Sequence, residues 1–198
     1  MKRFFICLLL TAITFGAQAQ SLDLRILESI NGPASLADQT WHTISKSVYA
    51  VDIAAPVSMV IVGFASKNKE LTTNGVKTAC AILVAEGFTE VLKRATRRER
   101  PYLKYPDLIT GKSLSTGYSF PSGHTATAFA TATSLSLTFP KWYVIAPSFA
   151  YASAVGYSRM YLGVHYPSDA VGGALLGAGS AFLTWKLQKL LDKQYHHK

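Results

Sequence analysis

Five apolar segments of helical length, separated by polar turns, constrain the fold of this chain more than any other feature. They run over residues 48–65, 76–93, 123–139, 142–158 and 167–191. The first contains Pro56, a predicted kink, and the polar residues 66–75 are predicted to form a loop before the second. The last contains Gly173-x-x-x-Gly177, a pattern that permits close helix packing. The sequence therefore predicts an all-α bundle of about five core helices, with short amphipathic helices added.

Their apolar stretches of 16 to 20 residues are at the lower edge of the length that spans a bilayer. The composition is 49% hydrophobic and 16% charged, against about 25% charged in soluble domains. This favours a membrane-embedded bundle. The Ala, Thr, Ser and Gly content would equally suit a compact soluble bundle, so that alternative stays open.

The first twenty residues have the pattern of a targeting segment. Lys2 and Arg3 precede an apolar run from Phe4 to Phe15, and Ala17-Gln18-Ala19 follows as a small-x-small cleavage pattern. We expect residues 1–19 to be a signal peptide, the alternative being an uncleaved first membrane helix. Both place residue 20 outside the cytoplasm and leave residues 20–198 as one domain. Cleavage would leave Cys80 as the only thiol, with no disulfide available.

Residues 21–47 are predicted to form two short amphipathic helices on a surface. Apolar residues recur at helical spacing from Leu22 to Ile30, and Asn31-Gly32-Pro33 ends this pattern. A second short helix is expected to contain Trp41 and Ile44. Their pattern is amphipathic rather than membrane-spanning.

The net charge of +9 indicates anionic partners. If each apolar segment crosses a membrane, residues 93–122 and 158–169 lie on the exported face, where basic residues are not expected. That face nevertheless carries eight: Lys93, Arg94, Arg97, Arg98, Arg100, Lys104, Lys112 and Arg159. An anionic substrate explains such a cluster. Nucleic acid is a poor candidate, because no nucleic-acid-binding motif is present.

The stretch from Ser158 to Asp169 carries three side chains that could bind an anion or take part in catalysis. Arg159 has a planar fork that suits phosphate or carboxylate, and His165 can act as nucleophile, base or acid near neutral pH. Pro167 is predicted to begin a helix, whose first turn can direct the Asp169 carboxylate back to His165 and fix its tautomer.

Two further blocks fall at the same face. In Lys93-x6-Arg100-Pro101 the spacing is close to two helical turns, so both cations can project from one side before Pro101 stops the helix. Pro121-Ser122-Gly123-His124 opens an apolar helix, whose free amides and dipole suit a phosphate. Taken singly, the three blocks fit a buried salt-bridge cluster, a solvated basic helix end and an N-cap beside a chance histidine. Together they predict one converging site.

The three blocks resemble the motifs of the type 2 phosphatidic acid phosphatase (PAP2) superfamily, which includes lipid phosphatases, bacterial acid phosphatases and vanadium haloperoxidases. The resemblance implies a helical bundle and a metal-independent phosphatase with a phosphohistidine intermediate. It implies His165 as nucleophile, Asp169 as its orienting partner and His124 as the acid that protonates the leaving group. The remaining positions would bind phosphate: Lys93, Arg100, Ser122, Gly123 and Arg159.

Three protein cations make a metal unnecessary, so no metal and no cofactor are expected, and the sequence gives no sign of an obligate protein partner. Our first hypothesis is a phosphatase of the bacterial inner membrane, facing the periplasm. It would act on a lipid such as phosphatidic acid, phosphatidylglycerophosphate, an isoprenyl diphosphate or a lipid A type anchor.

Three alternatives stay open. One is a soluble periplasmic acid phosphatase, and another is a module that only binds anionic headgroups, although His124, His165 and Asp169 would be superfluous for binding alone. A vanadate-dependent haloperoxidase is the third, with only 19 residues between Pro101 and Pro121 for the additional structure of such enzymes.

Overall fold

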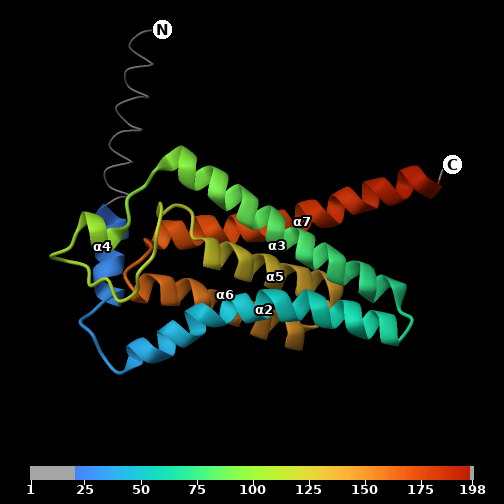
Figure 1. Ribbon diagram of the computed structural model, residues 1–198, viewed down its shortest axis with the longest axis horizontal. Helices are drawn as coiled ribbons and strands as arrows, with labels where there is room; N and C mark the ends of the chain where they lie inside the picture. Colours follow the sequence, from blue (N-terminus) through green and yellow to red (C-terminus); the bar gives the residue numbers. More distant parts are fainter. Residues whose placement is uncertain (1–20, 197–198) are drawn as a thin grey trace, which may run out of the picture.

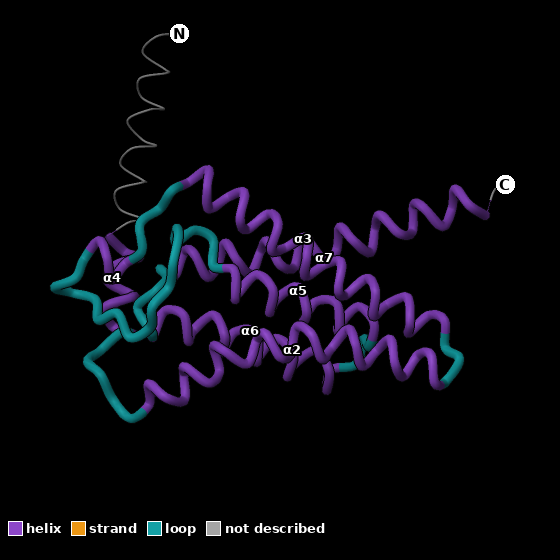
Figure 2. The backbone as a smooth tube through the Cα atoms, viewed as in Figure 1, coloured by secondary structure: helices purple, strands orange, loops and turns teal. Residues whose placement is uncertain are grey.

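The computed structural model describes residues 21–196, and the predicted signal peptide, residues 1–19, lies outside this range. Within it, the regular secondary structure consists of helices joined by loops, with no strand among these residues (Figure 2). Five long helices form the bundle: α2 (Ala37–Ala65), α3 (Lys69–Thr96), α5 (Gly123–Thr138), α6 (Trp142–Tyr161) and α7 (Pro167–His196). A helical segment over residues 21–30 and the short α4 (Pro101–Lys104) join them. The predicted all-α bundle is confirmed.

Consecutive long helices run antiparallel, so one end of the bundle collects the start of α2, the end of α3, the start of α5, the end of α6 and the start of α7 (Figure 1). The loop that contains α4 and the helical segment 21–30 lie at this same end (Figure 1). The segments that carry the three sequence motifs therefore meet.

Helix α7 packs directly on α5 through small residues. A Cβ atom added at Gly177 would overlap the carbonyl oxygen of Ala126, and one at Gly173 would lie 2.5 Å from the carbonyl oxygen of Ser122. The predicted role of this glycine pair in close packing is confirmed, and it fixes the start of α7 against the start of α5.

Three predicted boundaries were wrong. Trp41 and Ile44 belong to α2, which runs unbroken from Ala37 because no glycine or proline interrupts residues 37–55. Residues 69–75 are not loop: Asn68 caps α3 by accepting a hydrogen bond from the Leu71 amide at 3.0 Å. Helix α3 ends at Thr96, because Arg97 takes a left-handed conformation with φ of 47°.

The end of α3 changes the geometry expected for the first motif. Lys93 lies on α3, but Arg100 lies in the extended segment beyond it, and Pro101 begins α4 rather than stopping α3. The two cations therefore do not share a helix face. They approach the site from different elements.

The helical segment 21–30 packs one side against the rest of the protein and exposes the other. Leu27 is completely buried against Ile109 and Tyr166, whereas Leu22 and Ile26 are exposed. Asn31 then binds two elements at once, because its amide nitrogen donates to the carbonyl oxygens of Thr110 and Tyr161 at 3.0 and 2.8 Å. This segment is thus part of the scaffold around the α4 loop.

Candidate active site

A histidine–carboxylate pair is buried between α6 and α7. His165 lies in the turn after α6 and is 2% exposed, and Asp169 in the first turn of α7 is fully buried. Nδ1 of His165 lies 3.4 Å from Oδ2 of Asp169. The same Oδ2 accepts hydrogen bonds from the Ser119 hydroxyl and, at 2.9 Å, from the Tyr166 amide. The carboxylate is thereby held toward the imidazole.

Arg100 defines which nitrogen of His165 carries the hydrogen. Its Nη1 lies 3.2 Å from Nε2 of His165. A guanidinium can only donate, so Nε2 accepts and its lone pair is unprotonated. Nδ1 then bears the hydrogen and faces the Asp169 carboxylate. This is the tautomer that a nucleophilic Nε2 requires.

Burial keeps the His165 imidazole neutral. Loss of solvent lowers the pKa of His165 to about 4, against an ordinary value of about 6.5. Asp169 acts in the opposite direction, by hydrogen bond and by charge, and the nearby cations Arg159 and Arg100 lower the pKa further. The ring is therefore uncharged at neutral pH.

Arg100 is fixed by backbone carbonyl groups. It donates to the oxygens of Gly117 at 3.0 Å, Thr116 at 2.8 Å and Val164 at 2.9 Å. Together with His165 these contacts use four of the five N–H groups of the guanidinium. Arg100 thus offers one N–H on Nη2, and the N–H now directed at His165, to an incoming anion.

Arg159 is buried with several donors available. It donates to the hydroxyl groups of Ser45 at 2.6 Å and Ser115 at 3.0 Å. Its Nε is buried and has no hydrogen-bond partner among the described residues. Lys93 repels both Arg100 and Arg159, so the three cations are close enough to act on one another. Such a group of facing cations favours an anion between them.

The start of α5 supplies the remaining predicted positions. Ser122 occupies the N-cap position but makes no side-chain cap, so the amides of the first turn are not covered by a side chain. A Cβ atom at Gly123 would lie 3.7 Å from Nζ of Lys93, which places that cation beside this helix start. Glycine here keeps the space between amides and cation open.

His124 stands in the same first turn, on the side of α2. The centroid of its ring lies 5.0 Å from that of Tyr49, in an edge-on arrangement. The charges of Arg159, Lys93 and Arg100 act on it, so it belongs to the same cluster. The structure therefore brings all eight predicted site residues to one end of the bundle.

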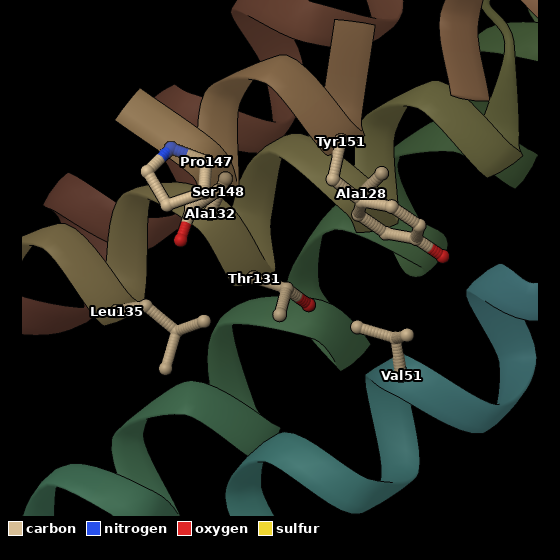
Figure 3. A pocket seen from close by; sticks show the side chains of 8 residues that line it. All are labelled: Val51, Ala128, Thr131, Ala132, Leu135, Pro147, Ser148 and Tyr151. Atoms are coloured by element: carbon tan, nitrogen blue, oxygen red, sulfur yellow. The ribbon is translucent and has the colours of Figure 1, made fainter. Parts of the chain in front are cut away.

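An apolar hollow of about 270 Å³ lies between α2, α5 and α6 (Figure 3). Ala128, which lines it, is one helical turn along α5 from His124. Ala128, Ala132 and Leu135 of α5 form its floor, and Pro147 and Tyr151 of α6 face Val51 of α2 across it (Figure 3). Thr131 adds one hydroxyl, which donates to Asp52 at 2.7 Å. None of the eight predicted site residues lines the hollow.

Several residues that build the site were not singled out from the sequence. Ser45 and Ser115 hold Arg159, Ser119 holds Asp169, and Arg98 and Asp23 form ion pairs beside it. Serines that bind side chains across the fold leave no periodic pattern. Arg98 appeared only as one of the basic residues on the exported face.

The described residues contain no group of three or more His, Cys, Asp or Glu side chains that could hold a metal ion. The positive charge of the site comes from Lys93, Arg100 and Arg159. Independence from metals remains a prediction.

A helical bundle with three cations and a buried histidine–carboxylate pair at one end has the features of a phosphoryl-transfer site. Residues 74–192, more than half of the chain, match the model of the PAP2 superfamily. The chain belongs to this superfamily.

Its relatives include phosphatases named for lipid substrates. It is 34% identical over 114 residues to an undecaprenyl-diphosphatase of Sulfolobus acidocaldarius, covering 58% of this chain and 55% of the relative. It is 36% identical over 101 residues to a lipid A 1-phosphatase of Rhizobium johnstonii, covering 49% and 41%. The chain thus spans about half the length of these curated relatives.

Two solved structures share the fold. The crystal structure of Aquifex aeolicus LpxE matches with a TM-score of 0.67 and 29% identity, covering 83% of this chain and 95% of that one. A transmembrane PAP2 type phosphatidylglycerolphosphate phosphatase from Bacillus subtilis matches with a TM-score of 0.72 and 24% identity, covering 94% of each. The fold is that of PAP2 membrane phosphatases.

Proposed function

We propose that this protein is a membrane-embedded phosphatase that removes phosphate from a phosphorylated lipid through a phosphohistidine on His165. One observation carries the proposal: Arg100 contacts the unprotonated Nε2 of a buried histidine and interacts electrostatically with Lys93, which lies beside the open amides of a helix start. Binding of an anion alone would not require an oriented, neutral imidazole. Phosphoryl transfer requires both a bound phosphate and an oriented, neutral nucleophile.

In the first step, Nε2 of His165 attacks phosphorus and the bond from phosphorus to the lipid oxygen breaks. Arg100, Arg159, Lys93, the Ser122 hydroxyl and the Gly123 amide bind the non-bridging oxygens. The negative charge of the bound phosphate offsets the surrounding cations, so that His124 takes up a proton on substrate binding and gives it to the departing lipid oxygen. Asp169 stabilises the positive charge that develops on the His165 ring.

In the second step, a water attacks phosphorus and the bond from phosphorus to Nε2 breaks. His124, now neutral, accepts the proton of the water. Inorganic phosphate leaves, and His165 returns to its neutral form with the hydrogen on Nδ1. Each histidine ends in its starting state.

The outer surface supports a membrane location. Among the described helices, α2 is long and apolar enough to cross a bilayer. Large apolar side chains are also exposed along other helices of the bundle: Leu83 and Val91 on α3, and Val171, Leu175 and Phe182 on α7. A soluble protein rarely exposes so extensive an apolar surface.

Charge supports an orientation with the site on the exported, periplasmic face of the inner membrane. Lys67, Lys69 and Lys141 lie in or beside the two turns at the opposite end of the bundle, as expected for a cytoplasmic face. Four of the basic residues at the site end belong to the phosphate site and its scaffold: Lys93, Arg98, Arg100 and Arg159.

The apolar hollow one helical turn from His124 supports a lipid as substrate, because a hydrocarbon chain could lie there.

The test is phosphate release by detergent-purified protein in EDTA, wild type beside His165→Ala. The substrates are long-chain and short-chain lipid phosphates, an isoprenyl diphosphate and a soluble aryl phosphate. We expect release that resists EDTA, prefers long chains and disappears in the variant. A phosphoenzyme that survives alkali but not acid should form in the wild type only.

Each other outcome rejects a defined part of the proposal. Equal or faster turnover of the aryl phosphate, with protein recovered in a detergent-free extract, would indicate a soluble acid phosphatase. Vanadate-dependent halide oxidation without phosphate release would indicate a haloperoxidase. Release that persists in His165→Ala would exclude the phosphohistidine.

A further inference from the structure

Arg98 connects the Asp169 carboxylate to a second acid, Asp23. Nη1 of Arg98 lies 2.6 Å from Oδ1 of Asp169, and Nη2 lies 2.6 Å from Oδ2 of Asp23. The guanidinium also lies 3.9 Å from the centroid of the Tyr166 ring. Arg98 is thus held between two carboxylates and an aromatic face, beside the candidate nucleophile.

Asp23 lies on the helical segment 21–30, outside the residues 74–192 that match the superfamily model. It is 6% exposed. Its Oδ1 accepts a hydrogen bond from the Ser168 amide at 2.8 Å, and its Oδ2 accepts one from the Ser168 hydroxyl. Asp23 therefore binds the start of α7 from another part of the chain, as an N-cap residue would.

The contacts of Asp169 divide between its two oxygens. Oδ2 faces Ser119, the Tyr166 amide and His165, while Oδ1 faces Arg98. Without Arg98, a fully buried carboxylate would lose its neighbouring cation, which favours protonation or rotation of the group. Either change would remove the acceptor that orients Nδ1 of His165.

Arg98 needs a partner for each of its two terminal nitrogens to hold this direction. Nη1 also donates to the Ser168 hydroxyl at 2.6 Å, whereas the partner of Nη2 is Asp23. Arg98 is 26% exposed, and an arginine with Nη2 unpaired at the edge of a site can adopt other rotamers. Asp23 pairs with Nη2 while Asp169 pairs with Nη1, and the two ion pairs together set the plane of the guanidinium.

We propose that Arg98 and Asp23 form a positioning pair for the catalytic histidine, in which Asp23 orients Arg98 and Arg98 orients Asp169. The inference rests on the proposed function and extends it, because it makes residues 21–30 part of the active site. Neither side chain contacts the substrate. Their effect is on the rate of the chemical step, not on phosphate binding.

The test is a double-mutant cycle of Asp23→Asn, Arg98→Gln and the double variant, in full-length protein. Replacing outer partners of catalytic histidines costs about 10–100-fold at metal sites. We expect kcat to fall about 10-fold in Asp23→Asn and about 100-fold in Arg98→Gln, at nearly constant KM. Because Asp23 acts through Arg98, the double variant should match Arg98→Gln within about twofold rather than multiply the two losses.

Two measurements separate positioning from folding. The inhibition constant of inorganic phosphate should stay within about twofold of wild type, since the phosphate-binding cations are untouched. Arg98→Lys, which keeps the charge but not the fork, should have a kcat between those of wild type and Arg98→Gln. Arg94→Gln is the control, because Arg94 is 76% exposed and its ion pair among residues 21–196 is a surface contact with Glu90. It should retain wild-type activity.

The outcomes distinguish the inference from the function on which it rests. An active wild type with multiplicative losses in the double variant would overturn the inference and leave the function standing. Loss of phosphate inhibition in parallel with kcat would also overturn it, since the pair would then support the whole pocket. A wild type that releases no phosphate from any substrate would overturn both.

Discussion

Arg100 donates from Nη1 toward Nε2 of His165 across 3.2 Å. This contact occupies the lone pair that must attack phosphorus. Without substrate, the nucleophilic nitrogen is therefore hydrogen-bonded to Arg100. An incoming phosphate oxygen can take over the Arg100 donor and release Nε2 at the same moment. The same guanidinium also opposes protonation of the ring, because a second positive charge beside it is unfavourable.

The acid limb of the activity profile should lie near pH 4. Catalysis requires neutral His165, and burial lowers the pKa of this residue to about 4. Activity should therefore persist as pH falls through the ordinary histidine range near about 6.5 and decline close to 4. The measurement is kcat/KM against pH, corrected for titration of the substrate phosphate near about pH 6. A limb above pH 6 after this correction would contradict the assignment.

The same shift predicts how stability changes with pH. The pKa of His165 is lower in the folded protein than in the unfolded chain, so the unfolded chain binds more protons between about pH 4 and 6.5. The free energy of unfolding should fall as pH falls through this window. His165→Gln removes the titrating group, so its thermal midpoint should depend less on pH. Parallel profiles for the two proteins would contradict the prediction.

Asp169→Asn should reduce kcat by about a thousandfold or more while leaving the fold intact. An asparagine amide can donate to Nδ1 of His165, which favours the tautomer with the hydrogen on Nε2. That tautomer lacks the nucleophilic lone pair and places a hydrogen against Arg100. The measurement is single-turnover phosphate release, with inorganic phosphate inhibition as a test of pocket integrity. Wild-type single-turnover rates in Asp169→Asn would show that the carboxylate does not set the tautomer.

The sequence alone predicts the helical bundle and the end of the bundle at which the site forms. Apolar segments of helical length specify helices, and antiparallel connection places alternate turns at the same end. Segment lengths and connections alone therefore predict that Lys93, His124 and His165 lie at one end of the bundle. The glycine pair of α7 was predicted for a similar reason, since small residues at one helix face indicate close packing.

Details that depend on single backbone conformations could not be predicted. The left-handed Arg97 ends α3 early, and nothing in its side chain requires that conformation. Asp23 and Ser45 are ordinary polar residues at unremarkable positions, and only the folded chain shows that they bind Arg98 and Arg159. Contacts of this kind join residues far apart in the chain, and no local pattern marks them.

Filling the hollow of Figure 3 should separate lipid from soluble substrates. Ser148 of α6 lies partly exposed on its rim, and Ser148→Phe would place a ring in the space proposed for the hydrocarbon chain. Displacing about two methylene groups would cost about 1.6 kcal/mol, or roughly tenfold in kcat/KM for a long-chain substrate. Turnover of a soluble aryl phosphate should not change.

The matched control is Ala150→Phe, two residues further along α6 on an exposed position outside the hollow. It adds a ring of the same size without entering the proposed chain site, so both substrates should react as in wild type. An equal effect of the two variants, or an equal loss on both substrates in Ser148→Phe, would exclude the hollow as the chain site.

Gly177→Ala should destabilise the protein and reduce activity together. The new methyl group would overlap the carbonyl oxygen of Ala126, so α7 must move away from α5. Overpacking of this kind costs about 1–3 kcal/mol. The displacement also strains the hydrogen bond from the Ser122 amide to the Asp169 carbonyl oxygen. This bond is 3.0 Å long and joins the phosphate-binding helix start to the start of α7.

The matched control is Gly179→Ala, two residues away. Its added Cβ atom meets nothing within 4 Å, so this variant should be neutral or slightly stabilising. The measurements are the thermal midpoint and the rate of phosphate release of the two variants under the same conditions. A Gly177→Ala protein as stable and active as Gly179→Ala would show that the close contact between α5 and α7 does not hold the site together.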